Sequence, residues 1–149
     1  MTSDRQWLQA AIELSRQCPP STTAFSVGAI VVDESGSTLA DGYSRRDDSR
    51  EHAEEAALRS IGADDVRLER ATIYSSLEPC SVRKSRPRSC AELIVTAGIR
   101  RVVFALREPP IFVAGAGADM LRAAGVEVVE ISQLAAEVRA INAQVLSPR

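Results

Sequence analysis

Aromatic residues and excess charge are both scarce in this sequence. Its 149 residues include one tryptophan, two tyrosines and three phenylalanines. Proteins that bind single-stranded nucleic acid stack bases on aromatic side chains, and few such side chains are available here. Eighteen basic and 20 acidic residues leave a formal charge of -2, so no global field attracts nucleic acid or an anionic membrane surface. The composition therefore argues against a nucleic-acid partner and favours a small-molecule one.

Long apolar runs are also missing. No stretch approaches the ~20 apolar residues that cross a bilayer, and residues 1–5 lack the apolar core of a signal peptide. Three cysteines in a chain of this kind are more typical of thiols or metal ligands than of a disulfide framework. We therefore expect a cytoplasmic protein with no membrane partner.

The remaining composition is that of an ordinary globular domain. Hydrophobic residues make up 45% of the chain and charged residues 26%, values that argue against a disordered, collagen-like or coiled-coil polypeptide. A length of 149 residues is enough to bury one substantial hydrophobic core. We expect a single domain over residues 1–149.

The only histidine, His52, begins the most informative pattern in the chain. Glu54 follows it closely, and Cys80 and Cys90 come later. One imidazole and two thiolates leave the fourth tetrahedral position of zinc open for water, as in catalytic zinc sites. A nearby carboxylate is then free to move protons. The pattern is typical of a catalytic zinc site.

Simpler explanations of these residues are open at this point. A lone histidine at a helix start can be a packing or capping residue, and Cys80 can be a buried thiol. A structural zinc site would need a fourth protein ligand, for which Cys18 or a carboxylate is available. Helical spacing also leaves the proton-carrying residue open, because Glu55 lies nearer the His52 face than Glu54 does.

Hydrophobic periodicity predicts alternating helices and strands. Helices are expected from Ser3 to the stop at Cys18-Pro19-Pro20, over 52–62, over 90–98, around Met120 up to Gly125, and from a cap at Ser132 to Val145. Strands are expected over 27–32, 38–42, 71–75, 101–106 and 126–131. The first two strands form a hairpin, and the alternation that follows calls for parallel strands with helical crossovers. The predicted fold class is α/β, with three α/β/α layers around a five-stranded mixed sheet.

Three features are candidates for substrate contacts. Gly28 lies inside the first predicted strand, which indicates either a close approach to its backbone or a bulge. A basic loop between the two later cysteines could hold a phosphate, or it could be a solvated turn; it contains Arg83, Lys84, Arg86 and Arg88. The polar segment 43–51 allows the same two interpretations, with Arg45, Arg46 and Arg50.

His-x-Glu followed by Pro-Cys and a further Cys is the signature of zinc-dependent deaminases. Within that cytidine-deaminase-like superfamily, the chain resembles the deaminase domain of the bifunctional riboflavin biosynthesis enzyme. The segments that carry the resemblance are Ser-Leu-Glu-Pro-Cys-Ser (76–81), Ala-Gly-Ile-Arg-Arg-Val-Val (97–103), Val-Ala-Gly-Ala-Gly (113–117) and Leu-Arg-Ala-Ala-Gly-Val-Glu-Val (121–128). The long gap between Cys80 and Cys90 is also similar to that family.

The resemblance implies a cytidine-deaminase-like fold with zinc as the cofactor. It makes His52, Cys80 and Cys90 the zinc ligands and Glu54 the proton shuttle. Water activated by zinc would attack the ring carbon that bears the exocyclic amine, while Glu54 protonates the ring nitrogen and then the departing amine. The implied substrate is an aminopyrimidine nucleotide or nucleoside, most like the diaminopyrimidinone ribosylamine phosphate of riboflavin synthesis. Dimers or tetramers would be similar to the habit of the superfamily.

The chain departs from that family at three places. Residues 23–25 are Thr-Ala-Phe where Pro-Asn-Pro is usual, and residues 108–111 are Glu-Pro-Pro-Ile where Asp-Pro-Asn-Pro is usual. Residues 82–89 replace a shorter, histidine-containing loop. Losing side chains that hydrogen-bond a substrate changes specificity strongly. The alternative is therefore a diverged cytosine-type nucleoside or nucleotide deaminase, and the remaining alternatives are a tRNA deaminase and a non-catalytic zinc domain.

Overall fold

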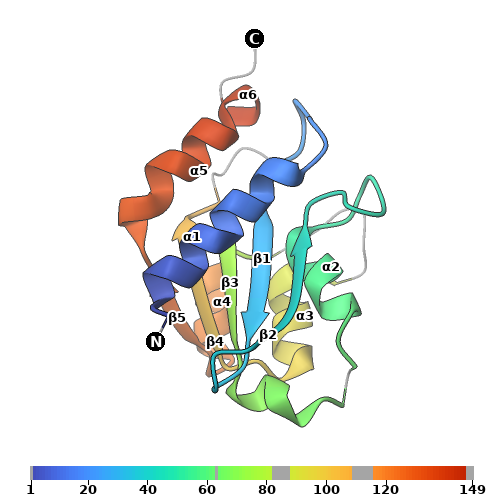
Figure 1. Ribbon diagram of the computed structural model, residues 1–149, viewed down its shortest axis with the longest axis vertical. Helices are drawn as coiled ribbons and strands as arrows, with labels where there is room; N and C mark the ends of the chain where they lie inside the picture. The colour runs from blue at the N-terminus through green and yellow to red at the C-terminus, as the bar shows by residue number, and fades with distance from the viewer. Residues whose placement is uncertain (1, 63, 82–87, 109–115, 147–149) are drawn as a thin grey trace.

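The computed structural model describes residues 2–62, 64–81, 88–108 and 116–146. One five-stranded sheet lies at its centre, with helices against both faces (Figure 1). The strands are β1 (Gly28–Val32), β2 (Thr38–Tyr43), β3 (Thr72–Leu77), β4 (Arg101–Leu106) and β5 (Glu127–Glu130). The α-helices are α1 (Asp4–Leu14), α2 (Ala53–Arg59), α3 (Cys90–Ala97), α4 (Gly117–Ala123), α5 (Ala135–Ile141) and α6 (Ala143–Leu146). Short 3-10 helices are η1 (Ser15–Gln17), η2 (Val66–Arg70) and η3 (Ser132–Leu134).

The strand order is β2-β1-β3-β4-β5, and the sheet is mixed as predicted. β1 runs antiparallel to both of its neighbours, β2 and β3, whereas β3, β4 and β5 are mutually parallel. β1 is buried at every position and β4 at every position after Arg101, because both lie inside the sheet between two helical layers. The carboxyl ends of β3 and β4 therefore meet at the same edge of the sheet.

Helices cover both faces of the sheet. α1 packs on β1, β3 and β4, and α5 packs on β4 (Figure 1). On the other face α2 contacts β1 and β2, α3 contacts α2 and α4, and α4 contacts β5. The sequence signals at the helix ends agree with this placement: Ser3 and Gln6 form the predicted capping box of α1, and Gly98 ends α3 in the left-handed conformation with φ 86°.

Gly28 is explained by the approach of α1. A Cβ atom on Gly28 would lie 2.0 Å from the carbonyl oxygen of Ala11, so only glycine lets the helix pack this closely on the strand. The alternative was a bulge at Gly28, but the register of the β1–β2 hairpin shifts between Val31 and Val32. The backbone N–H of Gly28 donates to Ser76 Oγ at 3.1 Å. Of the two readings of this glycine, close approach is thus correct, and its contact with substrate stays a prediction.

Several helix boundaries differ from the sequence-based expectation. α2 ends at Arg59 with Ser60 as its C-cap, before Gly62. Ser132 opens the 3-10 helix η3 and does not cap α5, whose N-cap is Leu134. The predicted last helix is also interrupted at Asn142, whose side-chain amide donates to the carbonyl oxygens of Ser26 and Val138. Side chains that bond to nearby backbone in this way compete with helix continuation.

Within the described ranges, no helix combines the length and the apolar character that crossing a membrane requires.

Candidate metal centre

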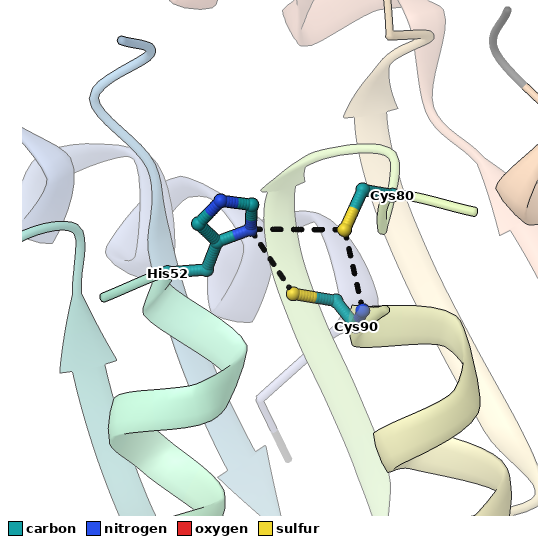
Figure 2. Close-up of side chains that lie close together, drawn as sticks. All are labelled: His52, Cys80 and Cys90. Atoms are coloured by element: carbon teal, nitrogen blue, oxygen red, sulfur yellow. Dashed lines mark hydrogen bonds between the residues drawn. The ribbon is translucent and has the colours of Figure 1, made fainter. Parts of the chain in front are cut away.

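Three potential metal ligands meet at the edge of the sheet where β3 ends. His52 is the N-cap of α2, Cys80 follows β3, and Cys90 is the first residue of α3. Their ligand atoms all lie within 4.8 Å of one another. Figure 2 shows the imidazole facing both sulfurs, with His52 Nδ1 3.3 Å from Cys90 Sγ and 3.7 Å from Cys80 Sγ. The sequence placed His52 in the first turn of the helix, and the structure places it one residue earlier.

The two cysteines are fixed by the start of α3. Ser89 is the N-cap of this helix and forms a capping box with Glu92, so the helix begins at Cys90. The carbonyl oxygen of Cys80 accepts a hydrogen bond from the N–H of Ala91 at 3.0 Å, and Cys80 Sγ accepts one from the N–H of Cys90 at 3.2 Å. The positive end of the α3 dipole therefore faces Cys80 Sγ.

Electrostatics favour the thiolate form of Cys80. Hydrogen bonding from Cys90 is the largest cause that holds the pKa of the Cys80 thiol well below its usual range, and hydrogen bonding and charge from His52 act in the same direction. Burial opposes them. A thiolate is the form that binds a metal. The set of one imidazole and two sulfurs, one of them already favoured as a thiolate, fits zinc with one coordination position to spare.

The loop that leads to His52 is held by hydrogen bonds between its own residues. The carbonyl oxygen of Glu51 accepts from the N–H of Arg45, and the N–H of Glu51 donates to the carbonyl oxygen of Asp48. The fully buried carboxylate of Glu51 accepts from the N–H of Asp47 and forms an ion pair with Arg59 on α2. These contacts anchor the residue immediately before His52 from both its main chain and its side chain.

Two of the three arginines of this loop, Arg45 and Arg46, bind backbone groups of neighbouring segments. Arg45 donates to the carbonyl oxygens of Pro19 and Phe25 and to Ser26 Oγ, and it stands at φ 61°. Arg46 donates to the carbonyl oxygens of Asp41 and Ala56. Their guanidinium groups are thus engaged with backbone, which favours the structural interpretation of this segment over a phosphate clamp.

Glu54 and Glu55 have different surroundings. Glu55 Oε1 accepts a hydrogen bond from the N–H of His52 at 3.3 Å and completes the capping box of α2. Glu54 is buried, with 3% of its surface exposed. The negative charges of Cys80 and Glu54 both raise the pKa of Glu108. These surroundings favour Glu54 over Glu55 as the proton shuttle, and that role stays a prediction.

Comparison with known proteins agrees with this geometry. Residues 1–106 match the family model of the cytidine and deoxycytidylate deaminase zinc-binding region. The chain belongs to this family. Its predicted cofactor, zinc, is confirmed by that match together with the His52, Cys80 and Cys90 cluster.

Relatives of this chain come from riboflavin biosynthesis. It is 39% identical over 127 residues to the diaminohydroxyphosphoribosylamino-pyrimidine deaminase of Schizosaccharomyces pombe, covering 84% of this chain and 31% of the relative. It is 37% identical over 126 residues to the riboflavin biosynthesis protein RibD of Escherichia coli, covering 84% and 33%. The chain thus spans about a third of the length of these curated relatives.

The fold is shared with solved structures of the same group. The Rib2 deaminase of Aspergillus oryzae superposes with a TM-score of 0.83 at 26% identity, covering 97% of this chain and 93% of that one. RibD of Acinetobacter baumannii superposes with a TM-score of 0.78 at 31% identity, covering 94% and 38%. The predicted cytidine-deaminase-like fold with a five-stranded mixed sheet is confirmed.

Two carboxylates that were not predicted as site residues belong to the surroundings of Cys80, whose charge raises the pKa of one of them. Glu78 is buried just before Cys80. Glu108 follows β4, at the position where the riboflavin deaminase pattern has aspartate, and its Oε2 is buried without a hydrogen-bond partner in the described residues. The change at position 108 was visible in the sequence, but its position near the cluster depends on the parallel pairing of β3 and β4.

The carboxyl group of Glu108 is favoured in its neutral form. Its pKa is raised to about 8, firstly by burial and also by the negative charges of Cys80, Glu78 and Glu54. In the unfolded chain the pKa is near the ordinary 4.5. A group with a raised folded pKa binds more protons when folded, so its contribution to stability falls as pH rises between the two values.

We expect Glu108→Gln to remove this pH dependence. In the metal-free protein, the free energy of unfolding of the wild type should fall relative to that of the variant as pH rises from about 4.5 to about 8. Urea unfolding of both proteins at several pH values measures the difference. A difference that is constant with pH would contradict the raised pKa.

The basic loop lies outside the described residues for the most part. Arg83, Lys84 and Arg86 fall in the segment 82–87, so their predicted role in holding a phosphate stays a prediction. Arg88 is described and exposed, immediately before the N-cap of α3.

Proposed function

We propose that this protein is a zinc-dependent hydrolytic deaminase of an aminopyrimidine nucleotide or nucleoside. His52, Cys80 and Cys90 are its zinc ligands and Glu54 its proton shuttle. The observation that carries the proposal is the convergence of three ligand atoms within 4.8 Å, with the buried Glu54 two residues after the histidine. Membership of the deaminase family supports it.

The chain's own residues divide the work of this reaction. When bound, zinc supplies a Lewis acid that makes water nucleophilic near neutral pH. Glu54 would pass one proton of that water to the ring nitrogen and then the second proton of the same water to the departing amine, so that ammonia leaves and a carbonyl group remains. Burial of Glu54 and of both cysteines keeps these transfers away from bulk solvent.

The first candidate substrate is the diaminopyrimidinone ribosylamine phosphate of riboflavin synthesis. The support is the likeness to deaminases of that pathway over 84% of this chain. The second candidate is a cytosine-type nucleoside or nucleotide. It is favoured by the absence of the family's two asparagines from segments 23–25 and 108–111, because a lost hydrogen-bonding partner shifts specificity more than a change of apolar shape does.

Ammonia release by the zinc-loaded protein tests both candidates. The diaminopyrimidinone ribosylamine phosphate, cytidine and cytidine monophosphate are supplied in parallel, and the Glu54→Gln variant gives the background rate for each. Turnover of the first compound alone assigns the riboflavin step. Turnover of a cytosine compound alone assigns the second candidate, and background rates with all three would overturn both.

We further propose that residues 1–149 act as one deaminase domain in the cytoplasm and associate into a dimer or tetramer. None of the three cysteines forms a disulfide, which suits a reducing compartment. The oligomeric state rests on likeness to the superfamily alone, and light scattering on the purified protein measures it directly.

A further inference from the structure

The carboxylate of Glu78 joins three parts of the chain that surround the metal cluster. Glu78 directly follows β3, and only 4% of its surface is exposed. Its Oε1 accepts a hydrogen bond from the N–H of Glu108 at 2.9 Å, and its Oε2 accepts one from the N–H of Ala118 at 2.8 Å. One oxygen therefore holds the chain that leaves β4, and the other holds the first turn of α4.

Main-chain contacts tighten the same junction. The N–H of Glu78 donates to the carbonyl oxygen of Leu106 at 2.8 Å. A Cβ atom on Gly117 would lie 1.7 Å from the carbonyl oxygen of Pro79, so glycine is required for α4 to begin directly against the turn that carries Cys80. The turn formed by Glu78, Pro79 and Cys80 is thus fixed against β4 and α4 on one side.

The other side of this turn is the metal cluster. Cys80 accepts the N–H of Ala91 with its carbonyl oxygen and the N–H of Cys90 with its sulfur. Cys80 therefore lies between two attachments, α3 on one side and the bonds of Glu78 on the other. A buried carboxylate left without its donors would draw in water or turn outward, because burying an unpaired charge is costly. Either response would move a residue only two positions from the sulfur.

We propose that Glu78 is a positioning residue for the metal centre: its two hydrogen bonds set the place of Cys80 Sγ relative to His52 and Cys90. The inference rests on the proposed function, which makes Cys80 a metal ligand. One of these bonds also fixes the backbone of Glu108. Glu78 acts through these neighbours and has no proton-transfer role.

Cobalt(II) binding tests the inference without any substrate. Cobalt replaces zinc in sites of this kind and reports sulfur ligation through its absorption spectrum. Glu78→Gln keeps the shape of the side chain but turns one acceptor into an NH₂ group that faces a backbone N–H. We expect its cobalt affinity to fall by roughly 10–100-fold, as when a residue supporting a metal ligand is removed, and its thiolate-to-cobalt band to shift.

Asp4→Asn is the matched control. It makes the same carboxylate-to-amide change at the opposite edge of the sheet, where Asp4 accepts from Tyr74 and Arg101. This variant should have a lower melting temperature than the wild type and an unchanged cobalt affinity and spectrum. The comparison separates an effect on the metal centre from a general loss of stability.

If Glu78→Gln does not fold, Glu78→Asp tests the same inference. It keeps the charge, but its shorter side chain does not reach both N–H groups, so the same loss of cobalt affinity is expected. Wild-type affinity and spectrum in a folded Glu78 variant would overturn the inference alone. Failure of the wild type itself to bind cobalt through thiolates would overturn the ligand set of the proposed function and this inference with it.

Discussion

Glu54→Gln is expected to lower the rate of ammonia release by roughly 10²–10⁴-fold, the contribution typical of general acid–base catalysis. Glutamine has nearly the same shape as glutamate but cannot take up and release the protons that the ring nitrogen and the departing amine require. Because Glu54 is not one of the three clustered ligands, the zinc content should stay at that of the wild type. Steady-state kinetics with metal analysis of the same samples measure both quantities.

Glu55→Gln is the control for this prediction. Glu55 is adjacent, and its carboxylate accepts the N–H of His52 in the capping box. A glutamine oxygen can accept the same bond, so the rate should change by less than about threefold and stability by no more than about 1 kcal/mol. A large loss of rate in Glu55→Gln together with a small one in Glu54→Gln would reverse the assignment of the two carboxylates.

The elements of this fold were predictable where periodicity and end signals coincide. The strand predicted over 101–106 is β4 to the residue, and Cys90 and Gly98 bound α3 as expected. A strand buried on both faces reads as an unbroken apolar run, and a glycine after a helix marks its end, so these signals are local. Two of the three candidate ligands, His52 and Cys90, stand at helix starts and were placed by the same local signals.

The supporting residues of the site could not be predicted in this way. Glu78 accepts N–H groups from residues 30 and 40 positions away, and Arg45 donates to carbonyl groups 20 and 26 positions away. The partners are backbone groups, which every residue carries, so no residue type or spacing in the sequence marks them. Tertiary pairing of the strands has to be known before such bonds can be seen.

The location of the centre has a simple physical reason. β3 and β4 are parallel, so the chain leaves both strands at one edge, and helices α2 and α3 begin near that edge. In open α/β sheets, ligands bind in the crevice outside the carboxyl ends of the parallel strands. The helix starts also present N–H groups and the positive end of the helix dipole, which favour thiolates. The strand ends and the helix starts therefore both favour a metal site at this edge of the sheet.

Cys90→Ala is expected to abolish both metal binding and ammonia release. The substitution removes a buried sulfur that lies 3.3 Å from His52 Nδ1. Two remaining ligands cannot hold zinc tightly, so affinity should fall by more than the ~10–100-fold typical of losing a residue that only supports a ligand. In the wild type, zinc at about 100 times its dissociation constant should stabilise the fold by about 2.7 kcal/mol, and this gain should be absent from the variant.

Cys18→Ala is the matched control, because Cys18 is the remaining cysteine and was the one available thiol for a closed structural site. Its sulfur lies 3.4 Å from the carbonyl oxygen of Val27 at the end of η1, outside the cluster. This variant should keep one zinc per chain, the thermal shift on adding zinc and the wild-type rate. If Cys18→Ala lost its zinc while Cys90→Ala retained it, the ligand set would be wrong. Loss of zinc in both variants would indicate a third sulfur ligand and a closed site, which leaves no position for water.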